Sequence, residues 1–96
     1  MKPSDALTAH RGELRELVTR HGFTRARIFG SVLTGTDDEE SDLDLLVDAP
    51  ARTTLFALVR LERAAQELLG VRVSVLTPGF LSKKFRDHVL QSAEPL

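Results

Sequence analysis

Two aspartates separated by one residue, Asp42 and Asp44, are the side chains of this sequence best suited to bind a cation. They lie in the segment Ser41-Asp-Leu-Asp-Leu-Leu-Val47, in which apolar residues recur at every second position. Because side chains alternate between the two faces of a β-strand, this pattern predicts a half-buried strand with both carboxylates on one face. Neighbouring carboxylates repel each other unless a cation lies between them, and Mg²⁺ is commonly held by one or two carboxylates together with substrate phosphates. We therefore expect a Mg²⁺ site here, with two solvated aspartates as the alternative.

A second candidate site is Gly30-Ser31, which follows an apolar segment. A glycine lets a phosphate approach the backbone, a serine offers a hydroxyl, and the N–H groups of a following helix favour an anion. We expect a short helix to start after this pair and to end at Gly35. The glycine spacing and the lysine of a Walker loop are missing, as is the spacing of a dinucleotide fingerprint, so an ordinary turn is the alternative.

Helices and strands that alternate along the chain must position these residues. Apolar residues at three- and four-residue steps predict amphipathic helices over 4–21, 55–69 and 81–89. We expect Ser4 to cap the first helix, Thr53 or Thr54 to cap the second, and Gly70 to end the second. Strands are predicted over 23–29, 42–47 and 71–76. The order α-β-(α)-β-α-β-α implies an α/β (α+β) fold in which helices pack on a sheet.

Composition excludes several classes of protein. A chain of 96 residues, 42% of them hydrophobic, predicts a single domain over 1–96 with one core. The absence of cysteine excludes disulfides, thiolate metal sites and thiol nucleophiles. No apolar run approaches the ~20 residues of a membrane span, so we expect a cytoplasmic protein. With 13 Lys and Arg against 14 Asp and Glu, and no basic stripe, direct DNA or RNA binding is not expected.

The charges are distributed unevenly along the chain. No Lys or Arg occurs between Arg27 and Arg52, and this segment holds half of the carboxylates. We expect the acidic run 37–40 to be a solvated loop. Asp48 shares the strand face of the two aspartates but lies about 13 Å from Asp44, so it is a poor ligand for the same ion. Arg25 or Arg27 could neutralise the acidic site.

Taken together, Gly30-Ser31, Gly35 and the Ser41–Val47 segment resemble the signature of the nucleotidyltransferase superfamily that includes DNA polymerase beta. Within it, the sequence is most similar to the minimal nucleotidyltransferase (MNT) domains, which are often antitoxins paired with HEPN-domain toxins. The resemblance spans nearly the whole chain, and its specific parts are the two short motifs. It implies a small mixed sheet of about three to four strands flanked by helices.

The resemblance also implies an activity and a set of site residues. An acceptor hydroxyl would attack the α-phosphorus of a nucleoside triphosphate, most simply ATP, and release pyrophosphate. Gly30 and Ser31 would contact the triphosphate, with Gly35 and Ser41 supporting the nucleotide-binding turn. Asp42 and Asp44 would ligate one or two Mg²⁺ ions. The implied acceptor is a hydroxyl of a protein partner, a HEPN toxin, while the oligomeric state is left open.

Two positions depart from the family pattern. Thr34 stands where family members usually carry an arginine, so a bidentate phosphate donor is missing. Ser74 stands where the family has a third catalytic carboxylate, and a serine cannot take a proton at neutral pH without a base beside it. Two hypotheses follow: a Mg²⁺-dependent nucleotidyltransferase, or an antitoxin that has lost catalysis and neutralises its toxin by occupying its surface.

Overall fold

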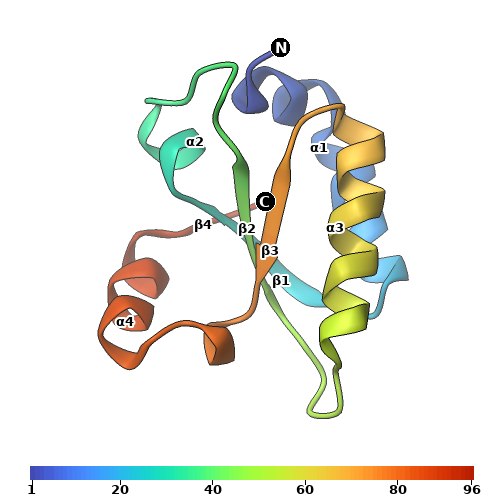
Figure 1. The fold of residues 1–96 in the computed structure, drawn as a ribbon, viewed down its shortest axis with the longest axis vertical. Helices are drawn as coiled ribbons and strands as arrows, with labels where there is room; N and C mark the ends of the chain where they lie inside the picture. Colours follow the sequence, from blue (N-terminus) through green and yellow to red (C-terminus); the bar gives the residue numbers. More distant parts are fainter.

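The computed structural model describes residues 1–96, which fold into one four-stranded mixed sheet with helices on both sides (Figure 1). Its elements are the helices α1 (Pro3–Arg20), α2 (Ser31–Thr34), α3 (Leu55–Leu69), η1 (Pro78–Phe80) and α4 (Lys83–Ser92), and the strands β1 (Thr24–Phe29), β2 (Leu43–Asp48), β3 (Val73–Leu76) and β4 (Glu94–Pro95). The predicted fold class and element order are confirmed, and β4 is an addition. No helix of the fold combines the length and the apolar character that crossing a bilayer requires.

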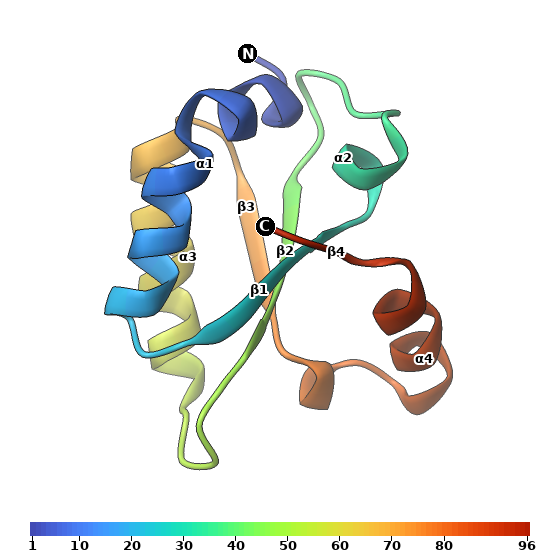
Figure 2. The ribbon, with the colours of Figure 1, turned by 180° about the vertical axis from the view of Figure 1, so that it is seen from behind.

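The sheet has the strand order β3-β2-β1-β4. β1 is antiparallel to both β2 and β4, whereas β2 and β3 are parallel. The connection between the parallel strands is α3, which lies beside α1 in both Figure 1 and Figure 2. β3 is an edge strand, and side chains of α3 protect its edge: Glu62 accepts a hydrogen bond from the Val75 N–H (3.0 Å) and Gln66 from the Val73 N–H (3.2 Å).

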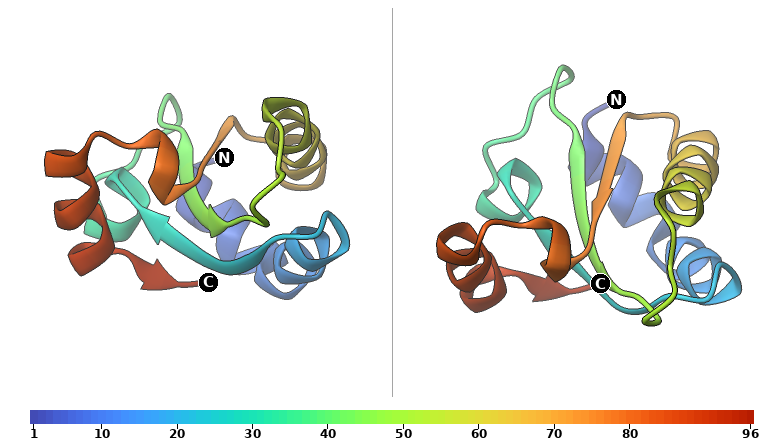
Figure 3. Two further views of the ribbon diagram at one scale, coloured as in Figure 1. Left: turned by 90° about the horizontal axis from the view of Figure 1, so that it is seen from below. Right: turned by 60° about the horizontal axis from the view of Figure 1, so that its bottom comes forward.

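Two apolar clusters lie on the two faces of the sheet. The larger cluster joins α1 and α3 to the face of β2 that carries Leu43, Leu45 and Val47, all fully buried. The smaller cluster consists of Phe29, Leu46, Leu81 and Val89, on the face beneath α4. Figure 3 shows α4 and α3 on opposite sides of the strands. The period-two pattern therefore predicted the faces of β2 correctly, with Asp44 on the α4 side.

Both ends of α3 agree with the prediction, whereas the start of α1 differs from it. Thr54 caps α3, accepting a hydrogen bond from the Ala57 N–H, and Gly70 ends it in the left-handed conformation. The prediction that Ser4 caps α1 is wrong, because Lys2 takes the cap position and Pro3 the first helical position. The fixed φ of proline favours that position. The Ser4 N–H lies in the first turn and has no acceptor within the helix. It donates to Asp37 Oδ2 at 2.9 Å and so ties the acidic loop to the start of α1.

Candidate active site

The two predicted aspartates lie where β2 begins. Asp44 is the second residue of this strand, and its partners in the sheet are Phe29 of β1 and Ser74 of β3. Asp42 directly precedes the strand, where the Leu43 N–H bonds to the Arg72 carbonyl (2.9 Å). Alternation places Asp42, Asp44, Arg72 and Ser74 on one face of the sheet. The structure thus brings together the three residues predicted to be catalytic, Asp42, Asp44 and Ser74, and adds Arg72.

Gly30 and Ser31 form the turn between β1 and α2, directly against Asp44. Gly30 has φ +76° and ψ −151°, and Ser31 is the first residue of α2. A Cβ atom placed on Gly30 would lie 2.1 Å from Asp44 Oδ2 and 3.1 Å from its Cγ. Any side chain at position 30 would therefore displace this carboxylate. The Gly30-Ser31 turn and the aspartate pair, which the family resemblance assigns to one nucleotide site, thus lie directly against each other.

Gly35 and Thr34 complete the α2 segment. Gly35 ends the helix in the left-handed conformation with φ +74°, as predicted. The hydroxyl of Thr34, at the position where the family pattern has arginine, lies 2.9 Å from that of Thr36 and also donates to carbonyls of its own turn. It therefore organises the turn locally.

The surroundings of Asp44 disfavour its ionised form. Its side chain is half-buried, and this burial raises the pKa of Asp44 above the ordinary value, with the charge of Asp42 as a smaller second cause. Both causes disfavour the ionised form. A cation bound between the two carboxylates would remove the repulsion and compensate the burial.

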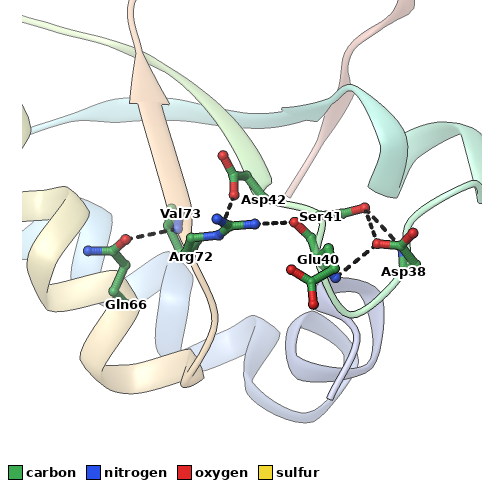
Figure 4. Close-up of polar contacts among 7 residues, drawn as sticks. All are labelled: Asp38, Glu40, Ser41, Asp42, Gln66, Arg72 and Val73. Atoms are coloured by element: carbon green, nitrogen blue, oxygen red, sulfur yellow. Dashed lines mark hydrogen bonds and ion pairs between the residues drawn. The ribbon is translucent and has the colours of Figure 1, made fainter.

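Arg72 is the cation that already lies beside this pair. Its Nε lies 2.9 Å from Asp42 Oδ1, and an Nη2–H of the same guanidinium donates to the Glu40 carbonyl (Figure 4). Both side chains are partly exposed, at 64% for Arg72 and 48% for Asp42. Arg72 is not among the site residues predicted from the sequence. The signal was available, because Arg72 has the same strand parity as Ser74.

Ser41 supports the loop that leads into β2. Its hydroxyl accepts a hydrogen bond from the Asp38 N–H (3.0 Å) and donates to Asp38 Oδ1 (3.2 Å), while the Glu40 N–H donates to the same carboxylate at 2.9 Å (Figure 4). This agrees with a supporting role for Ser41, and its direct contact with a nucleotide stays a prediction. Asp38, Glu39 and Glu40 are exposed, as expected for a solvated loop.

The arginines of β1 do not serve this site. Arg27 Nη2 lies 2.5 Å from Asp48 Oδ1, and Arg25 Nε lies 3.8 Å from Asp48 Oδ2. The prediction that one of them neutralises the acidic site is therefore wrong. The antiparallel register explains it, because β1 begins opposite the end of β2, where Asp48 pairs with Thr24.

The residues present fit a Mg²⁺ ion with two protein ligands. Asp42 and Asp44 supply hard oxygen donors, and Mg²⁺ takes its remaining ligands from water and phosphate. Nowhere does the structure gather three or more His, Cys, Asp and Glu side chains into a metal-binding group. Ser74, the register partner of Asp44, offers a hydroxyl where a third carboxylate would complete such a group.

The chain matches known proteins over nearly its whole length. Residues 7–94 match the model of the nucleotidyltransferase domain family. Protein adenylyltransferase MntA of Thermococcus cleftensis is 38% identical over 85 residues, which cover 88% of this chain and 83% of the relative.

Solved structures agree with this match. A structure described as a minimal nucleotidyltransferase superimposes with a TM-score of 0.86 and 43% identity, covering 97% of this chain and 95% of the other. A crystal structure of a toxin-antitoxin with AMP-PNP superimposes with a TM-score of 0.74 at 18% identity, covering 97% and 71% of the two chains. At that identity the second structure supports the fold alone.

Proposed function

Because this chain belongs to the nucleotidyltransferase domain family, we propose that it transfers AMP from ATP to a hydroxyl group of a protein partner. The observation that carries this proposal is the contact between its two motifs. The Gly30 backbone leaves no room for a side chain beside Asp44, so a phosphate held at the Gly30-Ser31 turn would lie next to the aspartate pair. The relative named protein adenylyltransferase supports AMP as the transferred group.

The residues of the two motifs each have a part in this reaction. Gly30 and Ser31 would hold the terminal phosphates with backbone N–H groups and the serine hydroxyl. Asp42 and Asp44 would hold Mg²⁺, which supplies charge stabilisation on the phosphoryl oxygens when bound. A bond forms between the acceptor oxygen and the α-phosphorus. The bond between the α-phosphorus and the oxygen that bridges it to the β-phosphorus breaks. Pyrophosphate leaves, and the acceptor proton passes to solvent water, since Ser74 is no base.

We infer that the partner is a toxin of the HEPN class and that the chain acts as its antitoxin. The resemblance of the two motifs to MNT domains supports this assignment, and the chain shares its fold with a structure described as a toxin-antitoxin with AMP-PNP. The cytoplasm, where ATP and such a toxin would meet, stays the predicted location.

Incubation with ATP, Mg²⁺ and the HEPN toxin of the same genome tests the proposal. We expect the intact mass of the toxin to rise by one AMP residue. The double variant Asp42→Asn, Asp44→Asn should abolish this adduct and still bind the toxin. Asp87→Asn, an exposed aspartate of α4 without an ion pair, is the matched control and should leave the adduct unchanged.

A second function is favoured by one observation, the hydroxyl of Ser74 beside Asp44. Without the third carboxylate, the chain could neutralise its toxin by covering it. If the toxin is neutralised and no adduct forms with the unaltered chain, the transferase proposal is wrong and this second function holds.

A further inference from the structure

Arg72 is the cationic side chain in contact with Asp42, and the reaction proposed above gives it no part. In a two-metal site the two ions lie about 3.5–4 Å apart and stabilise the attacking and the leaving oxygen. Here the guanidinium lies 2.9 Å from Asp42 Oδ1, so it competes with a metal ion for the lone pairs of that oxygen. Ser74, the register partner of Asp44, brings no third carboxylate that could help to hold a second ion.

We propose that Arg72 is the second cation of this site, so that the chain binds ATP with one divalent ion and one guanidinium. This inference rests on the proposed function. Asp42 and Asp44 with Arg72 carry a net charge of −1, and a single divalent ion makes the site positive toward a triphosphate. The guanidinium can donate to a carboxylate and to a phosphate oxygen together, because its five N–H groups form a planar fork.

The surroundings of Arg72 hold it in place for this role. The Glu40 carbonyl accepts from the same guanidinium, and Glu40 itself is fixed through its N–H to Asp38 (Figure 4). The backbone of Arg72 is also fixed, since its carbonyl accepts the Leu43 N–H at 2.9 Å. Arg72 is therefore tied through its backbone and its guanidinium to the segment that carries Asp42, and its charge stays beside that carboxylate.

The proposal predicts opposite effects of one substitution on two ligands. In Arg72→Gln, Mn²⁺ alone should bind more tightly, because the competing charge leaves Asp42. The non-transferable analogue α,β-methylene-ATP with Mn²⁺ should bind about fivefold more weakly, which corresponds to about 1 kcal/mol and suits a partly exposed ion pair. A merely structural role of Arg72 would weaken both, so the opposed signs distinguish the two.

Binding is measured by calorimetry and the number of bound Mn²⁺ ions by electron paramagnetic resonance. We expect one Mn²⁺ per chain in the presence of the analogue. Arg72→Lys should bind the analogue better than Arg72→Gln, because it keeps the charge. The control is Arg60→Gln, an exposed arginine of α3 without an ion pair, which should leave both affinities unchanged.

The possible outcomes separate the two proposals. If the unaltered chain does not bind the Mn²⁺ analogue complex, the proposed function itself fails. If it binds the analogue with two Mn²⁺ ions, or if Arg72→Gln behaves like Arg60→Gln, the role of Arg72 is wrong and the proposed function stands.

Discussion

The contact between Gly30 and Asp44 gives the sharpest test of the site geometry. In Gly30→Ala the new Cβ would lie 2.1 Å from Asp44 Oδ2, a distance at which the carboxylate must move. The backbone itself, with φ +76° and ψ −151°, lies in a region that is almost closed to residues other than glycine. The substitution therefore combines backbone strain with a steric clash.

The expected magnitude follows from these two costs. Backbone strain in this region costs about 1–3 kcal/mol. Turning the Asp44 side chain out of its preferred rotamer costs a further ~1 kcal/mol. The sum is about 3 kcal/mol, and in a domain of this size the thermal midpoint should fall by about 12–24 °C.

Thermal unfolding followed by circular dichroism measures the effect, and other glycines of the chain supply the controls. Gly35 has a similar φ of +74° with no atom within 4 Å of an added Cβ. Gly35→Ala should therefore show strain alone, about 1 kcal/mol. Gly12, inside α1, has neither problem, and Gly12→Ala should stabilise the chain by roughly 0.5–1 kcal/mol.

A double-mutant cycle isolates the clash itself. Asp44→Ala removes the carboxylate and leaves only its Cβ, at an ordinary contact distance of 3.4 Å from the added atom. Gly30→Ala should then cost about 1 kcal/mol less than it does beside Asp44. If Gly30→Ala is no more harmful than Gly35→Ala, and Asp44→Ala does not change its cost, the close approach of the two motifs is refuted.

Two further predictions concern the charge of Asp44 and the last strand. The raised pKa of Asp44 means that its ionisation destabilises the fold, so stability is lost as the pH rises from the ordinary value of 3.8 through the raised folded value. Asp44→Asn should raise the thermal midpoint at neutral pH, with a gain that disappears in acid; an equal gain at every pH would contradict the reasoning. Leu96→Ala should lower stability by about 2 kcal/mol, because Leu96 packs in the main core, whereas Leu55→Ala, at a position 63% exposed, should change the midpoint little. Equal midpoints for these two variants would show that the segment after α4 is not fixed to β1.

The parts of the fold that the sequence predicted are those with a strong local pattern. Alternation along 42–47 predicted which face of β2 carries the aspartates, and Thr54 and Gly70 marked the ends of α3. The site motifs were found for the same reason, since each is a short segment with its own chemistry. Their contact is a property of the sheet register that neither motif contains.

The features that were missed depend on partners far away in the chain. β4 has only two residues, Glu94 and Pro95, which show no alternation, and it is a strand because β1 offers its free edge. The Leu96 N–H then donates a hydrogen bond to the Ala26 carbonyl at 2.9 Å, and the Leu96 side chain packs in the main core. The pairing of Arg27 with Asp48 likewise follows from the register between two strands.

The site contains two features that cost stability, and this bears on the choice between the two functions. A half-buried carboxylate with a raised pKa and a glycine confined against it do nothing for the packing of the core. A chain that only covers a toxin has no need for either, because its effect would come from surface area. Electrostatically unfavourable groups are characteristic of sites that bind a compensating ligand. Asp44 with Gly30 therefore favours a cation and nucleotide site that works with two carboxylates over a surface that has lost one.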